Sequence, residues 1–461
     1  MKKYLFLITT FTYIVIFKVQ AQTDSTFTLK QCIEYAYQNS PSVKNSQLDE
    51  YISSARVKEI KSTGYPQVNG TAGLVYNPKL KQQILAADNP LFAGGGSMGG
   101  AMQGVKLNDG RLILPNFFQL KSAGDASATV TQLLFSGSYI VGLQAAKAYA
   151  ELSKKSSKQT RIEIVENVTK AYYMVMIGQE RMALFNTNLS RLDTLLKQTR
   201  ALNENGFVEK IDVDRLEVAY NNLLIEKQKG ENLLELGKVL LKYQIGMPVE
   251  KSLIVKEKIS DLPASTITTG NRPEYTNRIE YSLLQSKKEL EVLNLKNVKA
   301  GYLPTLAAFA TGGIFNSHSQ FERMFITPWY SYSMVGLNLT LPIFDGFGKY
   351  YKGQQAKLEI QKSENTLKNL ENTINFQVKQ SEINLKNYQI SLDAQKRNLE
   401  LATEIARVTK VKYQEGIGSN LEVITAESSL RESQVNYFNA IYDVLVANID
   451  YQISLGTLPI E

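Results

Sequence analysis

The 461-residue sequence contains one cysteine, Cys32, and one histidine, His318. A disulfide framework needs paired cysteines and a Cys2His2-type zinc site needs four ligands, so neither is predicted. A lone histidine also leaves no spare partner for a histidine-dependent nucleophile relay. The sequence therefore excludes a disulfide framework, a zinc site of that type and a histidine-dependent nucleophile relay.

Long apolar runs are also scarce. Beyond the first few dozen residues no stretch approaches the ~18 consecutive apolar residues that a membrane-spanning helix requires. With 43% hydrophobic and 21% charged residues, the composition is compatible with water. Any contact with a bilayer must therefore be made by strands or by a surface helix.

Residues 1–21 differ from the rest. Two lysines precede an apolar run from Tyr4 to Phe17, and Ala21 closes the segment, which predicts a secretory signal peptide and a mature chain beginning at Gln22. The alternative is an uncleaved anchor, although Lys18 interrupts the run. The formal charge is +8, and removing the three lysines of this segment leaves +5. Because lysines and glutamates are interspersed, nucleic acid is not expected as a partner.

An internal duplication determines the expected organisation. Residues 205–213 resemble residues 415–423 at an offset of 210, and the offset recurs at three further positions: Glu217 with Glu427, Val168 with Val378, and Gly246 with Gly456. We predict a first repeat over 22–246, a linker over 247–272 and a second repeat over 273–461. Each repeat is expected to contain a short helix, a strand, a loop, a strand, a very long helix, a glycine turn and a second long helix.

The predicted strands alternate apolar or small residues with polar ones, as residues 68–76 and 127–134 illustrate. This pattern is typical of a barrel wall with lipid outside and water inside, and the alternative is a half-buried sheet in a soluble protein. The fourth strand, about 330–341, changes phase, which predicts a bulge or a bend. Aromatic residues at strand ends suit a membrane interface. They are Trp329, Tyr330, Tyr76 and Phe315.

One loop is expected between the two strands of each strand pair. The first, 77–124, contains the glycine-rich run 94–104. Such a run can cradle phosphate when a strand precedes it and a helix begins directly after it, but no helical pattern follows here. We expect an exposed flexible loop, and in the second loop, 316–323, we expect His318 to be solvated.

Two heptad seams run from Ile162 to Leu196 and from Val378 to Tyr413. No proline interrupts 137–205 or 346–415, so each helix could extend roughly 100 Å at 1.5 Å per residue. Four strands cannot close a barrel, which needs about eight, and open sheet edges are not tolerated in lipid. The chain is therefore expected to assemble with copies of itself, dimers giving eight strands and trimers twelve.

The duplicated turns 206–213 and 413–423, the following Ala426 and the segment 301–304 (Gly-Tyr-Leu-Pro) resemble the TolC-like outer-membrane efflux proteins. The resemblance covers essentially the whole mature chain. It implies a mainly α protein whose two strand pairs contribute to a trimeric twelve-stranded transmembrane barrel, continued by a long antiparallel coiled-coil tunnel in the periplasm.

The resemblance also implies a function. The chain would be a passive outer-membrane duct of a tripartite efflux or type I secretion system, carrying drugs, metals, siderophores or proteins. Such a duct is not an enzyme, and no metal or other cofactor is expected. Its partners would be two further copies of the chain, a periplasmic adaptor, an inner-membrane transporter and outer-membrane lipid. The alternatives are a coiled-coil periplasmic adaptor or structural envelope protein, and a hydrolase on a helical scaffold. An adaptor would have one helical hairpin, and a hydrolase would need paired carboxylates in an aromatic cleft.

In this family the closed periplasmic mouth is held by a tyrosine, an arginine and aspartates. Tyr413 matches the tyrosine, Glu422 the first aspartate, and Asp212 the aspartate from the first repeat. Gly418 occupies the arginine position and Thr425 the second aspartate position, so an arginine–aspartate lock of that design is missing.

Carboxylates at the mouth would form a cation-favouring ring in a trimer. The alternative, compatible with the first, is that Asp212 and Glu422 stabilise the N-termini of their helices. The residues expected to contact an adaptor lie at the helical tips. They are Gly206, Phe207, Gly416, Ile417, Gly418 and Ser419.

Overall fold

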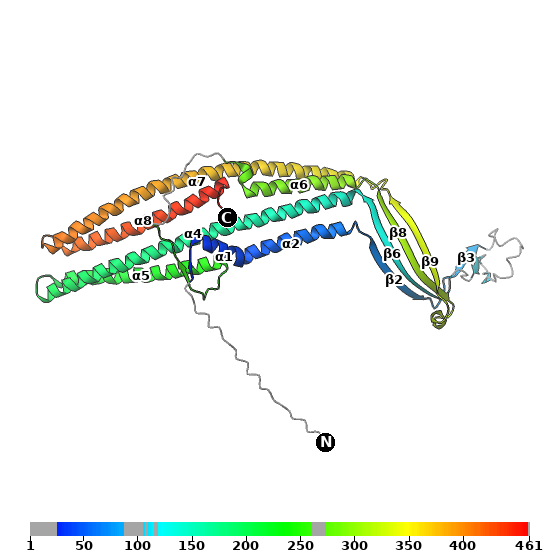
Figure 1. The fold of residues 1–461 in the computed structure, drawn as a ribbon, viewed down its shortest axis with the longest axis horizontal. Coiled ribbons are helices and arrows are strands. Elements are labelled where there is room, and N and C mark those ends of the chain that lie inside the picture. The colour runs from blue at the N-terminus through cyan, green and yellow to red at the C-terminus, as the bar shows by residue number, and fades with distance from the viewer. Residues whose placement is uncertain are drawn as a thin grey trace, which may run out of the picture. The chain divides into compact units, whose positions relative to one another are not determined.

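The computed structural model describes residues 25–86, 105–106, 109, 111–114, 119–259 and 273–459 (Figure 1). The predicted signal peptide, the glycine-rich run 94–104 and residues 260–272 of the predicted linker lie outside these ranges. The chain divides into two compact units. The helical unit comprises Met1–Tyr51, Leu152–Gln285 and Glu364–Glu461, and the strand unit comprises Ile52–Glu151 and Ser286–Ser363. The boundaries of the two sequence repeats stay predictions.

The strand unit is built on a four-stranded antiparallel sheet with the order β2-β6-β8-β9. These strands are β2 (Gln67–Tyr76), β6 (Ser122–Ser136), β8 (Thr305–His318) and β9 (Tyr330–Thr340). The four strands predicted from alternation are thus confirmed. Helix α2 (Pro41–Ser62) enters this unit, and α6 (Ile279–Ala300) leads into β8.

The expected bulge in the fourth strand is wrong. Strand β9 pairs with β8 in an unbroken register, and the irregularity lies instead in β6, between Leu133 and Phe135. In β9 the apolar side chains change face between Met334 and Val335 while the backbone continues regularly. The break in the apolar alternation therefore reflects a change in which face is apolar, and not the extra residue that a bulge inserts.

The loop expectations need correction as well. Within 77–124 the described residues form a small sheet with the order β3-β5-β4, and β6 begins at Ser122. Its strands are β3 (Gln83–Ala86), β4 (Val105–Lys106) and β5 (Arg111–Leu114). The second loop begins later than predicted, because β8 continues to His318. The buried Asn316 donates from Nδ2 to the Met324 carbonyl oxygen at 2.6 Å, which ties the strand end to a short 3-10 helix, η3 (Glu322–Phe325).

The long helices are confirmed. Helix α4 spans Gly137–Glu204 and α7 spans Gly348–Gln414, each about 100 Å at 1.5 Å per residue. Each is followed by a 36-residue helix, α5 (Lys210–Ile245) or α8 (Asn420–Leu455). Among the described residues, no helix combines the length and the apolarity needed to cross a bilayer.

The two shorter helices end alike. Gly246 and Gly456, which the sequence paired at an offset of 210, both adopt φ 72° and cap their helices in the left-handed conformation. A Cβ atom at Gly246 would lie 2.8 Å from the backbone of Asn39, and one at Gly456 would lie 2.7 Å from the Asn277 carbonyl oxygen. Both positions therefore require glycine for its conformation and for its lack of a side chain.

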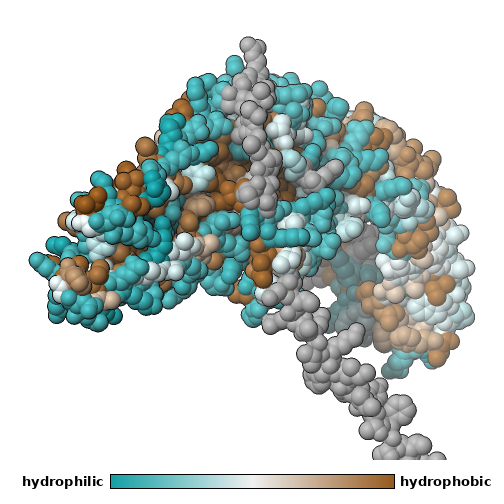
Figure 2. Space-filling view, turned by 60° about the vertical axis from the view of Figure 1, so that its left-hand side comes forward, coloured by the Kyte–Doolittle hydropathy of each residue, from teal (hydrophilic) through white to brown (hydrophobic). Residues whose placement is uncertain are grey.

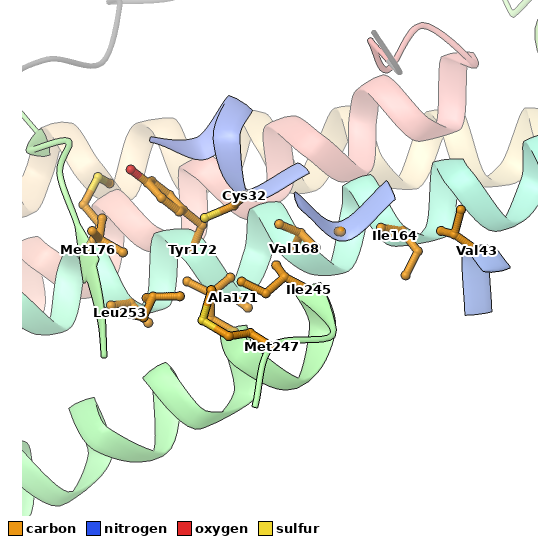
Figure 3. Packing of buried hydrophobic residues seen from close by; sticks show 14 residues of the cluster. Cys32, Val43, Ile164, Val168, Ala171, Tyr172, Met176, Ile245, Met247 and Leu253 are labelled. Atoms are coloured by element: carbon orange, nitrogen blue, oxygen red, sulfur yellow. The ribbon is translucent and has the colours of Figure 1, made fainter. Parts of the chain in front are cut away.

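The main core of the helical unit lies where α1 (Leu29–Asn39) and β7 (Leu253–Val255) pack on α4 and α5 (Figure 3). Tyr172 is fully buried there, and its hydroxyl donates to the Phe27 carbonyl oxygen at 3.3 Å. Phe27 belongs to β1 (Ser25–Phe27), which pairs in parallel with β7. Cys32 is fully buried, and burial raises the pKa of its thiol to about 12, so it stays protonated at neutral pH.

The predicted heptad seams face other helices for most of their length. Val168, Tyr172 and Val175 of the first seam are fully buried, and Val378 and Leu385 of the second are buried against α8. The heptad spacing also places Tyr388 in the second seam, and this residue departs from the prediction, because it is 39% exposed.

Candidate functional site at the helical tips

The two helical tips of the helical unit have the same backbone structure. Gly206 follows α4 and Gly416 follows α7, with φ 76° and 74°. The next amide in each tip reaches back across the last turn, from Phe207 to the Leu202 carbonyl oxygen at 2.9 Å and from Ile417 to that of Lys412 at 3.0 Å. This pattern is the Schellman motif, in which a left-handed glycine lets the final carbonyl groups find donors.

Each tip presents one large apolar side chain to solvent. Phe207 is 77% exposed and Ile417 is 78% exposed. Figure 2 shows hydrophobic patches at the near ends of the helices, within a mostly hydrophilic surface. Ser419 distinguishes the second tip, since its hydroxyl accepts from the Glu422 amide at 3.2 Å and caps α8.

Tyr413 lies between the two hairpins. Its ring packs against an apolar cluster formed mainly by α4 and α5, and its hydroxyl lies 3.2 Å from that of Thr199, which is fully buried. Thr199 belongs to α4 and Tyr413 to α7, so this contact ties one hairpin to the other. Thr199 carries no motif in the sequence and was not predicted.

The predicted constriction carboxylates occupy first-turn positions of their helices. Asp212 lies in the first turn of α5, 3.6 Å from Arg215, and Glu422 lies in the first turn of α8. Both positions fit stabilisation by the helix dipole. The backbone oxygen of Asp212 also accepts from Nδ2 of Asn420 at 2.8 Å, so the two repeats touch at this point.

Thr425 uses its hydroxyl locally, donating to the Leu421 carbonyl oxygen at 2.8 Å. With Glu422 it lines a groove of about 540 Å³ between α7 and α8. The proposed constriction residues are thus near one another in the fold, and their role in narrowing a channel stays a prediction.

The structure adds a set of polar contacts that sequence reasoning missed. Glu427 of α8 lies 3.6 Å from Arg191 of α4, and Arg431, one turn further along α8, lies 3.4 Å from Glu226 of α5. The α8 helix therefore pairs with both helices of the first hairpin. The side chain of Glu427 is only 14% exposed, so this carboxylate is largely withdrawn from water.

A third contact extends this set by one more turn, where Nδ2 of Asn188 donates to Oε1 of Gln434 at 2.9 Å. Asn188 also accepts from the Arg191 guanidinium and orients it. We call these residues the cross-hairpin clamp. Its members are Asn188, Arg191, Glu226, Glu427, Arg431 and Gln434.

The duplication gave a partial signal for the clamp. Glu217 is the repeat counterpart of Glu427, and it pairs with Arg200 of its own hairpin at 3.3 Å. Glu427 instead reaches across to the other hairpin. The two repeats therefore carry glutamate at the same repeat position but pair it with different arginines. The repeat offset in the sequence does not reveal these partners.

Comparisons with known proteins agree on one family. Residues 293–457 match the model of the outer membrane efflux protein family. The chain is 23% identical to nodulation protein T of Rhizobium leguminosarum bv. trifolii, over 76% of this chain and 75% of that protein. It is 21% identical to outer membrane protein TolC of Vibrio cholerae serotype O1, over 75% of this chain and 78% of that protein.

A solved structure shows the same fold. The outer membrane channel CmeC of Campylobacter jejuni superposes with a TM-score of 0.72, covering 93% of this chain and 85% of that one at 15% identity.

The Tyr413 contact yields a first prediction. Tyr413→Ala should raise the resting conductance in planar bilayers more than Asp212→Ala combined with Glu422→Ala, because it removes both the ring and its bond to Thr199. The double carboxylate change should lower cation selectivity more. Tyr413→Phe keeps the ring and loses only the contact with Thr199, so it should raise the conductance less than Tyr413→Ala. A wild-type channel that is already fully open would place the constriction elsewhere.

The clamp yields a second prediction. Arg191→Glu leaves Glu427 facing a like charge and should lower the free energy of unfolding by about 1 kcal/mol, measured by thermal denaturation followed by circular dichroism. Adding Glu427→Arg should restore at least half of the loss. Lys197→Glu is the matched control, because its pair with Asp193 is exposed on the same helix. A double variant no more stable than the single would show that the two side chains do not interact.

Proposed function

Because the chain is a TolC-like member of the outer membrane efflux protein family, we propose that it forms the outer-membrane duct of a tripartite efflux or type I secretion system. It is a channel protein and not an enzyme. In this proposal substrates pass from an inner-membrane transporter and a periplasmic adaptor through the duct and leave the cell.

The observation that carries the proposal is the two-faced sheet of the strand unit. Paired residues lie on the same face, and the row Val68, Val130, Ala310 and Val335 runs across all four strands. The large side chains of this face are exposed to the surroundings. They include Val68, Leu74, Val130, Ile314, Val335, Leu337 and Leu339. A continuous exposed apolar face of this kind suits contact with lipid.

The opposite face carries polar side chains that meet across strands, together with some apolar ones such as Val75 and Phe315. The hydroxyls of Thr71 and Ser127 lie 3.0 Å apart, and those of Thr129 and Thr311 lie 2.9 Å apart. Near the sheet's end the Tyr332 hydroxyl donates to Asp125 at 2.9 Å. Such a lining would be wetted by a water-filled channel.

The sheet supports assembly with further copies. It is four strands wide, and β2 and β9 form its outer edges. In lipid the amide and carbonyl groups of these edges need partners, which the edge strands of neighbouring copies can supply. A trimer brings twelve strands together, and the long helices would continue it as a tunnel.

The helical tips are the proposed docking site for the adaptor. The exposed Phe207 and Ile417 offer two equivalent apolar knobs per chain, six in a trimer. Gly206 and Gly416 have open space where a side chain would begin, which leaves the backbone accessible to a partner. Gly418 follows Ile417 in the same tip and packs closely on Lys412 and Tyr413. Ser419 holds the second tip in shape by capping α8.

Assembly can be tested on protein extracted from outer membrane in detergent. Multi-angle light scattering should give a mass of three chains, because the four strands of one chain cannot close a barrel and strands of several chains must combine. A heat-dissociated sample on the same column supplies the monomer reference. A monodisperse monomer with an intact β signal by circular dichroism would contradict the proposed assembly.

A further inference from the structure

A single carboxylate stands in the main sheet of the strand unit. Asp125 of β6 is the only aspartate, glutamate, lysine or arginine in the four strands β2, β6, β8 and β9. It lies on the same face as Ser127 and Thr129, which is the face with polar side chains. An isolated charge in a membrane-spanning segment is costly and usually marks a path for ions or substrates.

Asp125 lies toward the end of the sheet that is remote from the long helices. The last residue of β6, Ser136, is followed directly by α4, and Asp125 is the fourth residue of that strand. Strand β9 begins at this same end with Tyr330. In the proposed channel a substrate would therefore pass Asp125 shortly before it leaves the duct.

Three aromatic rings gather beside this carboxylate. The Tyr332 hydroxyl donates to Oδ2 of Asp125 at 2.9 Å. The centre of the Phe315 ring lies 6.0 Å from that of Tyr332 and 6.1 Å from that of Tyr330. Phe315 is 44% exposed and Tyr330 is 62% exposed, so both rings remain accessible to a ligand.

Two glycines shape the surroundings of the cluster. Gly313 of β8 lies opposite Tyr332, and a Cβ atom there would lie 2.9 Å from the Tyr332 ring. The ring thus crosses β8 over this glycine and reaches a carboxylate two strands away. Gly73 of β2 lies opposite Asp125, and a Cβ atom there would meet no described atom within 4 Å. The carboxylate therefore has open space on its β2 side.

The charge of Asp125 is not compensated in the part of the chain that the structure describes. There, its one side-chain hydrogen-bond partner is the Tyr332 hydroxyl, and no lysine or arginine pairs with it. The residue is also exposed. A cation that approached this face would thus meet a free negative charge with aromatic rings around it.

The donor set favours an organic cation over a metal ion. Ca²⁺ takes about six to eight oxygen ligands, and the cluster offers only one carboxylate and the hydroxyls of two tyrosines. Aromatic faces, by contrast, attract ammonium groups, and quaternary ammonium ions above all. The alkyl or aryl substituents of such an ion would also bury apolar surface against the rings.

We propose that Asp125, Phe315, Tyr330 and Tyr332 form a binding site for organic ammonium cations on the channel face of the sheet, one site in each chain. The carboxylate balances the charge, the rings contact the substituents, and the space at Gly73 admits them. Because the site is exposed, binding is weak and readily reversed, as passage through a channel requires. This inference rests on the proposed function, because it needs this face to line a water-filled channel.

Binding can be measured on the purified full-length protein in a non-ionic detergent. The probe is phenyltrimethylammonium, whose methyl protons are followed by saturation-transfer difference NMR at constant ionic strength. We expect a saturable signal that an equal concentration of MgCl₂ does not abolish. Asp125→Asn removes the charge but keeps an acceptor for Tyr332, and Phe315→Leu removes one ring. Each variant should weaken binding by about threefold or more.

A second pair of variants tests the open space without touching the carboxylate or the rings. Gly73→Leu fills the space beside Asp125, whereas Gly70→Leu places the same side chain on the opposite face of the same strand. We expect weaker binding, again by about threefold or more, for Gly73→Leu alone. All variants should keep the wild-type β signal by circular dichroism.

Planar-bilayer conductance of the same preparations separates the two proposals. A wild type that conducts current but gives no saturable binding would overturn the cation site and leave the proposed duct standing. Binding that Asp125→Asn and Phe315→Leu leave unchanged, or that MgCl₂ abolishes, would do the same. A protein that binds the probe but conducts no current would overturn the duct, and with it the position of this site on a channel wall.

Discussion

A four-stranded sheet with two open edges leaves backbone amide and carbonyl groups that need hydrogen-bond partners. Within the described residues, β2 and β9 each have a neighbour on one side only. One face of the sheet carries exposed valines, leucines and isoleucines, which water does not favour. Lipid would cover that apolar face, but it offers no hydrogen-bond partners to the edge strands. The proposed lipid contact and the proposed closure with further copies therefore both follow from this sheet.

The duplication supplies the second organising feature, and the two copies have diverged where interactions matter. Both tips retain the left-handed glycine and the exposed apolar residue after it. Ser419 caps α8, whereas Glu209 at the start of α5 makes no side-chain cap. The clamp shows the same divergence, because it uses α8 of the second hairpin against both helices of the first. The two hairpins thus share an architecture and differ in their side-chain contacts.

Much of the fold could be predicted because it follows from local periodicity. Heptad spacing and the absence of proline identified α4 and α7, and alternation identified the four strands of the main sheet. The bulge was assigned to the wrong strand. In β9 the apolar residues move from one face to the other at Val335 while the backbone stays regular. Which face carries apolar residues depends on what surrounds the sheet. The small sheet within 77–124 was missed, since strands of two to four residues give too little pattern.

The candidate site was predicted less completely. Glycine turns and helix-start carboxylates have short-range signatures, so Gly206, Gly416, Asp212 and Glu422 could be located by sequence. The partners of Tyr413 and Glu427 could not, because Thr199 and Arg191 lie more than 200 residues away in the chain. Such pairs depend on how two hairpins pack, which local patterns do not specify.

In the proposed channel, one face of the sheet meets lipid while the other lines a water-filled lumen. Adjacent residues Leu337 and Asn338 of β9 lie on opposite faces, and the buried Cys32 leaves the background unreactive. Single-channel currents should be recorded for Leu337→Cys and Asn338→Cys before and after a charged, water-soluble thiol reagent. We expect a stepwise loss of current for Asn338→Cys and no change for Leu337→Cys or the wild type. Block of Leu337→Cys with Asn338→Cys unaffected would contradict it.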